Sequence, residues 1–187
     1  MPRKQIYTKE KIIDRAYDYL RKEGLKNFDA RNLSKEIGMS TMPIYSYFES
    51  MDFLLQEVQN KAKGLLIKYQ MTNYTGMNFL DMGIGYIKFA LEETNLFRLL
   101  FLEEKSLQQH WEELIESLFD LCIKEMKKVP FLEGKSDQQL KELTFDIWVY
   151  THGLASLLSA KVIKPIGEED LVDLLQGIAR GLLTRLE

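Results

Sequence analysis

Helical periodicity is the sequence feature that most constrains the fold of this chain. From Thr8 to the end, apolar residues recur at intervals of three or four, and no alternation of apolar and polar residues is long enough for a strand. Helix-capping residues precede many of these segments, and glycine or proline follows several of them. The sequence therefore predicts an all-α fold of about nine helices.

The composition is typical of a soluble globular protein, with 45% hydrophobic and 28% charged residues in a chain of 187. Charges interrupt the longest apolar stretches, and Met1 to Lys11 contain no apolar signal region, so we expect no membrane span and a cytoplasmic location. Cys122 cannot form an intrachain disulfide, and the two histidines leave no recognisable zinc spacing. Neither a catalytic pattern nor a Gly-rich phosphate loop is present, so we expect no enzyme, no metal and no cofactor.

Two helices with clear boundaries are expected near the N-terminus. Thr8 is a good N-cap for a first helix that Gly24 ends. Asp29 caps a second, short helix over Ala30–Ile37. Gly38 follows it and supplies the left-handed conformation that a tight turn needs.

A third helix is expected after this turn, capped by Ser40, with Ile44 and Phe48 facing the core. Two short helices around a tight turn match a helix-turn-helix, whose recognition helix enters the major groove. The residues left to point outward or sideways are Thr41, Met42, Pro43, Tyr45 and Tyr47. Tyrosine and threonine hydroxyls suit phosphate oxygens and base edges, although the two tyrosines can equally cover the core of a short helix.

The charge is unevenly distributed along the chain. Residues 1–48 hold ten Lys or Arg against six Asp or Glu, whereas residues 49–187 hold fifteen against twenty-two. A basic N-terminal segment, the head, followed by an acidic remainder, the body, is consistent with a head that binds phosphate groups.

The stretch FDARNLSKEIGMSTMPIYSYFESMDFLL resembles the N-terminal domain of the TetR family of bacterial repressors, and the match covers roughly Thr8 to Val58. The family pattern of a turn glycine, a tyrosine, an aromatic residue, a phenylalanine and a downstream leucine corresponds here to Gly38, Tyr45, Tyr47, Phe48 and Leu55. Met51 stands where the family commonly has a lysine, which puts one phosphate contact in doubt.

The resemblance implies a set of DNA contacts. Ser40, Tyr45 and Tyr47 would contact phosphates, and Thr41, Met42 and Pro43 would meet base edges. Arg31 would approach the DNA backbone, and Arg3 and Lys4 would follow the duplex as an arm. The recognition helix is poor in Arg, Asn and Gln, so we expect discrimination through thymine methyl groups and DNA shape.

Further helices are expected from Ser50 to about Tyr69, then over Met77–Glu93, Asn95–Glu104 and Leu107–Lys128, from Ser136 to before Pro165, and from near Glu168. Capping-box spacing occurs at Ser106 and Gln109, and again at Ser136 and Gln139. We divide the chain into a helix-turn-helix domain (residues 1–49), a connecting helix and loop (50–75) and a helical body (76–187). The segments ETNLFRLLFLEE and FDIWVYTHGLASLL resemble the sixth and eighth helices of the family, which implies a ligand-binding and dimerisation domain.

The last two expected helices carry small residues that permit close approach and are suited to an intersubunit four-helix bundle. The last helix is also apolar on more than one face. The predicted dimer interface comprises Gly153, Ser156, Ala160, Leu174, Gly177, Ile178, Gly181 and Leu182. The alternative is a core helix weakened by its glycines.

Aromatic and methionine side chains are frequent in the middle of the body. The predicted ligand pocket comprises Met82, Tyr86, Phe89, Phe97, Phe101, Trp111, Phe119 and Trp148, with His152 one turn after the last tryptophan. Each of these is equally an ordinary core residue, and the histidine a satisfied core histidine. As a group they favour a hydrophobic small-molecule effector.

These features predict a ligand-responsive regulator, a repressor that binds a palindromic operator in double-stranded DNA as a homodimer and is released by a hydrophobic small molecule. The alternative is a helical small-molecule-binding or protein-interaction module with a vestigial DNA-binding head. Sequence does not separate a repressor from an activator.

Overall fold

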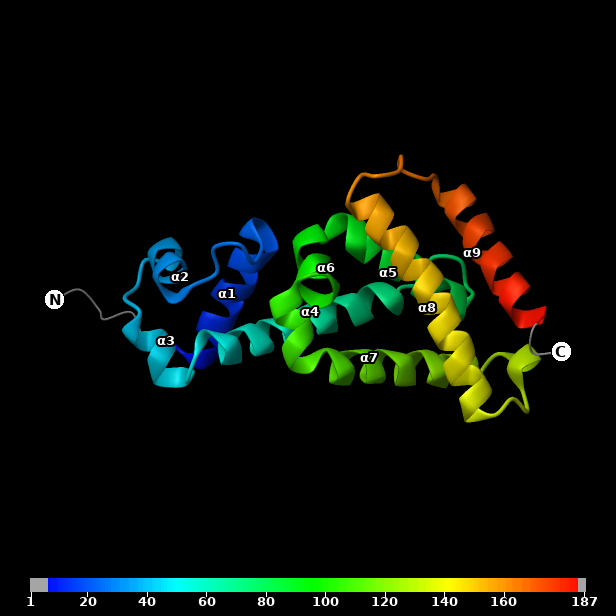
Figure 1. Cartoon of the computed structure of the whole chain (residues 1–187), viewed down its shortest axis with the longest axis horizontal. Coiled ribbons are helices and arrows are strands. Elements are labelled where there is room, and N and C mark those ends of the chain that lie inside the picture. Colours follow the sequence, from blue (N-terminus) through cyan, green and yellow to red (C-terminus); the bar gives the residue numbers. More distant parts are fainter. Residues whose placement is uncertain (1–6, 185–187) are drawn as a thin grey trace. The chain divides into compact units, whose positions relative to one another are not determined.

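The computed structural model describes residues 7–184, except for the side chains of residues 104–111, and these residues form nine α-helices, one 3-10 helix and no strand (Figure 1). The α-helices are α1 (Lys9–Glu23), α2 (Ala30–Ile37), α3 (Met42–Tyr47), α4 (Met51–Gln70), α5 (Asn78–Glu92), α6 (Thr94–Phe101), α7 (Glu104–Met126), α8 (Asp137–Ser159) and α9 (Glu168–Leu183), and the 3-10 helix is η1 (Pro130–Leu132). The prediction of an all-α fold with about nine helices is confirmed.

The chain forms two compact units. Unit 1 consists of the chain up to Leu65 together with Thr94–His110, and unit 2 consists of Leu66–Glu93 together with the chain from Trp111 onward. Helix α4 is continuous and contributes to both units. The functional boundaries expected from the sequence, 1–49, 50–75 and 76–187, stay a prediction.

Within unit 1, helix α6 fixes the end of helix α1. The side-chain amide of Asn95 donates hydrogen bonds to the backbone carbonyls of Arg21 and Lys22, each at 3.0 Å. Helix α1 ends there because Gly24 adopts a positive φ of 73°. The N-terminal three-helix segment therefore receives support from a helix far along the chain.

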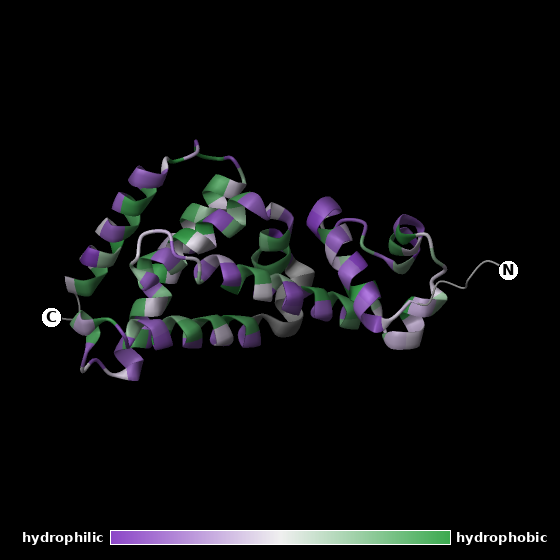
Figure 2. Ribbon diagram, turned by 180° about the vertical axis from the view of Figure 1, so that it is seen from behind, coloured by the Kyte–Doolittle hydropathy of each residue, from purple (hydrophilic) through white to green (hydrophobic). Residues whose placement is uncertain are grey.

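Within unit 2, helices α5, α8 and α9 pack against one another. Their inner faces, the end of α7 and η1 enclose a core cluster that consists of Met126, Leu132, Leu140, Leu143 and Leu182. Figure 2 shows hydrophobic and hydrophilic residues on different sides of these helices, as expected of amphipathic helices around a core. This arrangement leaves cavities beside the cluster, which are described below.

Three of the predicted helix caps are confirmed. The Thr8 side chain accepts a hydrogen bond from Lys11 N, and Asp29 accepts from the backbone N–H groups of Arg31 and Asn32. Ser136 and Gln139 form the expected capping box at the start of α8. These caps depend on residues within four positions of one another, which is why the sequence reveals them.

Two other predicted caps are wrong. Helix α3 begins at Met42, so Thr41 and not Ser40 is its N-cap; the Thr41 carbonyl accepts from Ile44 N at 3.1 Å, and its side chain makes no capping hydrogen bond. Helix α7 begins at Glu104, so Ser106 lies inside the helix and is not its cap.

Replacing Asp29 with alanine is expected to lower the free energy of unfolding by about 1 kcal/mol. The Asp29 carboxylate accepts backbone hydrogen bonds at 2.9 and 2.8 Å, and these donors lose their partner in the variant. Urea unfolding of both proteins measures the difference. Asp18→Ala is the matched control, since Asp18 is exposed in the middle of α1, and it should change stability by less than about 0.5 kcal/mol. Equal effects of the two substitutions would contradict the capping role.

Candidate functional site

The turn between α2 and α3 has the geometry of a helix-turn-helix. Gly38 adopts a left-handed conformation (φ 69°, ψ 37°), and Met39 N donates to Ser34 O at 2.9 Å. No atom lies within 4 Å of the position that a Gly38 Cβ would take, so the backbone angle and not space favours glycine here. The turn presents the short helix α3 on the surface of unit 1.

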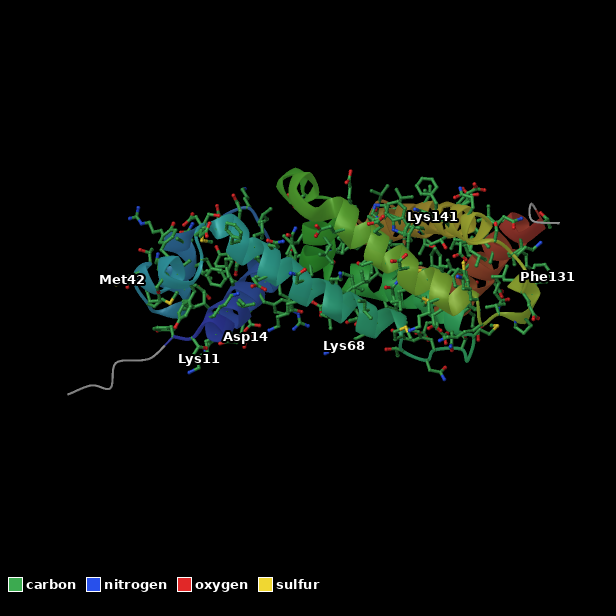
Figure 3. The ribbon with its side chains drawn as sticks, turned by 90° about the horizontal axis from the view of Figure 1, so that it is seen from below. Lys11, Asp14, Met42, Lys68, Phe131 and Lys141 are labelled. Atoms are coloured by element: carbon green, nitrogen blue, oxygen red, sulfur yellow. The ribbon has the colours of Figure 1, made fainter. Side chains whose placement is uncertain are left out.

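Helix α3 has a buried side and an exposed side. Ile44 and Phe48 are buried in unit 1, as predicted. Met42, Tyr45 and Tyr47 are 77%, 56% and 47% exposed, and Figure 3 shows Met42 at the outer surface of this helix. Helix α3 therefore presents an apolar and aromatic surface on its exposed side.

The two tyrosines of α3 differ in their hydrogen bonds. Tyr47 Oη donates to Tyr7 O at 3.1 Å, and Tyr7 Oη donates to Gly38 O at 3.5 Å. Tyr7 thus links α3 to the turn, a role that the sequence pattern did not reveal. The Tyr45 hydroxyl has no hydrogen-bond partner among the described residues, so it is the more available of the two for an external partner.

The other expected DNA-contacting residues that the structure describes lie on α2, in the turn and on α3. Arg31 and Ser40 are exposed, and Thr41 and Pro43 are partly buried. Arg31 forms no ion pair with any described residue, whereas Lys9 pairs with Glu57 at 2.6 Å. Arg3 and Lys4 lie outside the described residues. Ser40, Thr41, Met42, Pro43, Tyr45 and Tyr47 thus lie on the turn and on α3, whereas Arg31 lies in the first turn of α2.

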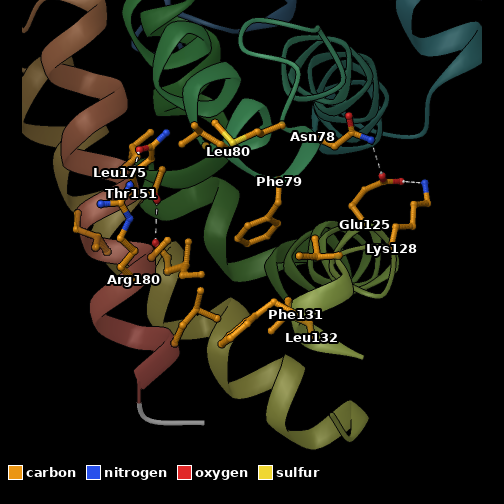
Figure 4. Close-up of a pocket in the computed structure, with 18 of the residues that line it drawn as sticks. Asn78, Phe79, Leu80, Glu125, Lys128, Phe131, Leu132, Thr151, Leu175 and Arg180 are labelled. Atoms are coloured by element: carbon orange, nitrogen blue, oxygen red, sulfur yellow. Dashed lines mark hydrogen bonds and ion pairs between the residues drawn. The ribbon is translucent and has the colours of Figure 1, made fainter. Parts of the chain in front are cut away.

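Unit 2 contains an outer cavity of about 620 Å³. Its walls come from the start of α5, the end of α7, η1, the middle of α8 and the second half of α9 (Figure 4). The lining is mainly apolar and includes Phe79, Leu80, Val129, Phe131, Leu132, Ile147, Leu175, Ile178 and Leu183. The volume falls in the range of small-molecule sites in proteins.

Two of the three charged residues in the lining of the outer cavity, Glu125 and Lys128, pair with each other. Glu125 is 3% exposed and accepts hydrogen bonds from Lys128 Nζ at 2.6 Å and Asn78 Nδ2 at 3.5 Å, as drawn in Figure 4. The hydrogen bond from Lys128 holds the pKa of Glu125 below its usual value, so this carboxylate is ionised at neutral pH. Arg180 Nη2 donates to Gln176 Oε1 at 3.1 Å.

An inner cavity of about 60 Å³ lies next to the outer one. Four predicted pocket residues line it, namely Met82, Tyr86, Phe119 and Trp148. Phe79, Gly83, Ile147 and Thr151 line both cavities. Gln70 and Cys122 also line the inner cavity, and neither was predicted as a site residue.

Three other predicted pocket residues line neither cavity. Phe89, Phe97 and Phe101 are buried core residues, and the last two belong to unit 1. The side chain of Trp111 lies outside the described residues. The sequence pattern cannot separate these positions from the cavity because core and pocket use the same side chains.

His152 is a satisfied histidine. Its Nδ1 lies 2.9 Å from Tyr86 Oη and its Nε2 3.4 Å from Ser156 Oγ, both as hydrogen bonds. Burial lowers the pKa of His152, so the ring is neutral at neutral pH. The residue fixes Tyr86 in the cavity wall and does not itself line either cavity.

The outer sides of α8 and α9 are partly apolar. Of the predicted interface residues, Gly153, Ala160, Leu174, Gly177 and Gly181 are exposed, and Ser156 and Ile178 are partly buried. Leu182 instead packs in the core cluster of unit 2. Large apolar side chains that were not predicted are also exposed here, namely Phe145, Val149, Tyr150 and Leu157.

Neither a metal site nor a membrane span is found in the described part of the chain. Its His, Cys, Asp and Glu side chains form no group of three or more with metal-binding geometry. None of its helices combines the length and apolar character needed to cross a bilayer.

Comparison with known proteins identifies the fold. No family model matches the chain, and no curated protein matches its sequence. A TetR-like transcriptional regulator from Rhodococcus sp. RHA1 matches over 92% of this chain and 94% of its own, with a TM-score of 0.62 and 15% identity. A protein of unknown function from the same organism has a TM-score of 0.66 at 15% identity, covering 99% of this chain and 98% of its own. A TetR/AcrR regulator from Thermobifida fusca YX-ER1 has a TM-score of 0.56 at 15% identity, covering 93% and 95%. The chain therefore has the fold of TetR-like regulators.

Proposed function

We propose that this protein is a ligand-responsive transcriptional regulator that binds double-stranded operator DNA as a homodimer. The exposed side of α3 carries this proposal, because Met42, Tyr45 and Tyr47 stand outward on a helix whose other side is anchored by Ile44 and Phe48. A helix presented in this way after a tight turn is suited to the major groove.

The chemistry around α3 suits a phosphate backbone and thymine methyl groups. The available Tyr45 hydroxyl and the unpaired Arg31 guanidinium are donors for phosphate oxygens. Met42 and Pro43 offer apolar contact to bases. Specificity then depends on thymine contacts and DNA shape more than on bidentate hydrogen bonds.

A homodimer is supported by the exposed apolar side of α8 and α9. Val149, Leu157 and Leu174 are large apolar residues on these helices, and exposed glycines beside them permit close approach of a second copy. Two copies would place two recognition helices on successive major grooves, about 34 to 36 Å apart on a palindromic operator. A hydrophobic small molecule in the unit 2 cavities would release the DNA, because ligand and DNA affinities are reciprocally coupled.

The test is DNA binding by the full chain, measured by fluorescence anisotropy with DNA from upstream of its own gene. Tyr45→Phe is expected to weaken binding about fivefold through loss of one hydrogen bond. Arg31→Ala is expected to reduce the slope of log affinity against log salt by about 1. Lys141→Ala is the control, since Lys141 is an exposed lysine of α8, and its affinity should equal that of the wild type. Absence of any specific, salt-sensitive complex would refute the proposal.

The second candidate is a small-molecule-binding or protein-interaction module with a vestigial DNA-binding head. Two observations favour it, namely the internal hydrogen bond of Tyr47 and the presence of Met51 where the resembling family commonly has a lysine. Ligand binding without salt-sensitive DNA binding would establish this second function.

A further inference from the structure

The inner cavity contains a buried polar atom without a partner. Gln70, the last residue of α4, is 6% exposed, and its Oε1 is buried and accepts no hydrogen bond in the structure. Gln70 also lines the inner cavity. Buried polar side-chain atoms are nearly always hydrogen-bonded, so an acceptor without a partner, on a side chain that lines a cavity, marks a position for an external polar group.

The lining of the inner cavity excludes a charged group. Its described residues include no Asp, Glu, Lys or Arg. Burial raises the pKa of the Cys122 thiol to about 12 and raises the pKa of Tyr86, so both side chains are neutral at neutral pH. An ion placed there would lose its hydration without gaining a counter-charge. The polar group that meets Gln70 is therefore uncharged.

The inner and outer cavities lie next to each other and share part of their lining. Phe79, Ile147 and Thr151 contribute to both, and Figure 4 shows the Phe79 ring pointing into the space between α5, α7 and α8. Its side chain is only partly buried, and it lies in the lining that the two cavities share. The outer cavity, of about 620 Å³, can hold a much larger part of a ligand than the inner cavity, of about 60 Å³.

We propose that the effector is an elongated, uncharged amphiphile whose apolar body fills the outer cavity and whose hydrogen-bonding end, a hydroxyl or primary amide, enters past Phe79 and binds the Gln70 side chain. This inference rests on the proposed ligand site and names the chemical class that fits it. In the outer lining, Glu125 and Lys128 pair with each other, and the exposed Arg180 donates to the neutral Gln176 side chain.

The position of Gln70 also connects the ligand to the rest of the chain. Gln70 closes the last turn of α4, and α4 begins at Met51, three residues after Phe48. A ligand whose end group binds Gln70 therefore contacts α4, a helix that contributes residues to both units.

The experiment measures calorimetric binding of three probes of equal chain length, 1-decanol, decane and decanoate, to the full-length protein at pH 7.5 without DNA. Decanol is expected to bind about fivefold more tightly than decane, and decanoate more weakly than decanol. In Gln70→Leu, the affinity for decanol should fall to that for decane, while the affinity for decane is retained or improved. Lys141→Ala, outside both cavities, should behave as the wild type.

The outcomes separate this inference from the proposed function. Tightest binding of decanoate, binding of none of the probes, or a decanol preference that survives in Gln70→Leu would overturn the inference whatever the DNA assays show. Failure of specific DNA binding would refute the regulator and leave these ligand measurements standing. If Gln70→Leu does not fold, Gln70→Asn provides the same comparison. The asparagine side chain is one methylene shorter, so its amide no longer reaches the ligand, and this variant should also lose the preference for decanol.

Discussion

Replacing Gly85 with alanine is expected to lower the free energy of unfolding by about 2 kcal/mol or more. A Cβ at this position of α5 would overlap the backbone carbonyl of Tyr69 and lie 2.7 Å from Gln70 N. Both neighbours are backbone atoms in the last turn of α4, so no side-chain rotation relieves the overlap. The gain in helix propensity from glycine to alanine, about 1 kcal/mol, is too small to offset it.

Gly64→Ala is the matched control for this prediction. Gly64 also lies inside a helix, α4, but no atom lies within 4 Å of the position of its Cβ. This substitution should raise the free energy of unfolding by about 0.5 to 1 kcal/mol. Guanidinium unfolding of the three proteins measures both changes, and a Gly85→Ala protein as stable as Gly64→Ala would contradict the close approach of α4 and α5.

The same close approach fixes Gln70 beside the inner cavity. Tyr69 Oη donates to Glu92 Oε2 at 2.7 Å, and the Tyr69 ring packs on Phe89 with centroids 5.7 Å apart. Both contacts lie C-terminal to Gly85 on α5, and they hold the last turn of α4 against this helix. We therefore expect that any Gly85→Ala protein that folds also loses the decanol preference, because the turn that carries Gln70 must shift.

The helix-turn-helix could be predicted almost completely because its signals are local. Thr8, Asp29 and Gly38 act through hydrogen bonds or backbone angles within four residues, and all three were identified from the sequence. The cap of α3 was placed one residue early because Ser40 and Thr41 have similar capping preference. The choice between them depends on the backbone path after the turn, which side-chain preference does not encode.

The cavities could be predicted only in part because they depend on tertiary packing. Tyr86, Phe119 and Trp148 were identified as pocket residues by type, but the same reasoning included Phe97, which is core in the other unit. Gln70 was interpreted as the first residue of a loop. Helix α4 includes Gln70 as its last residue. Because the side chain is buried, its Oε1 atom is left without a hydrogen-bond donor among the described residues.

Val149→Glu is expected to convert the proposed dimer to a monomer and to weaken binding to a palindromic operator about 100-fold or more. Val149 is 47% exposed on the outer side of α8, between the exposed residues Phe145 and Gly153, so the fold of one subunit tolerates the change. Around a twofold axis, each interface would gain two carboxylates without partners, and burying them costs several kcal/mol in dimerisation free energy. Analytical ultracentrifugation measures the first effect, and anisotropy with operator DNA measures the second.

Gln138→Glu separates the interface from a general effect of added charge. Gln138 is exposed in the first turn of the same helix, eleven residues or about 16 Å before Val149, where the exposed residues are polar. The Gln138→Glu variant gains one negative charge per subunit, and its dimerisation and its operator affinity should equal those of the wild type. A Val149→Glu protein that remains dimeric would remove the apolar side of α8 from the interface. A monomer that binds a half-site as tightly as the wild type binds the palindrome would show that operator recognition depends on α3 alone and not on pairing of two subunits.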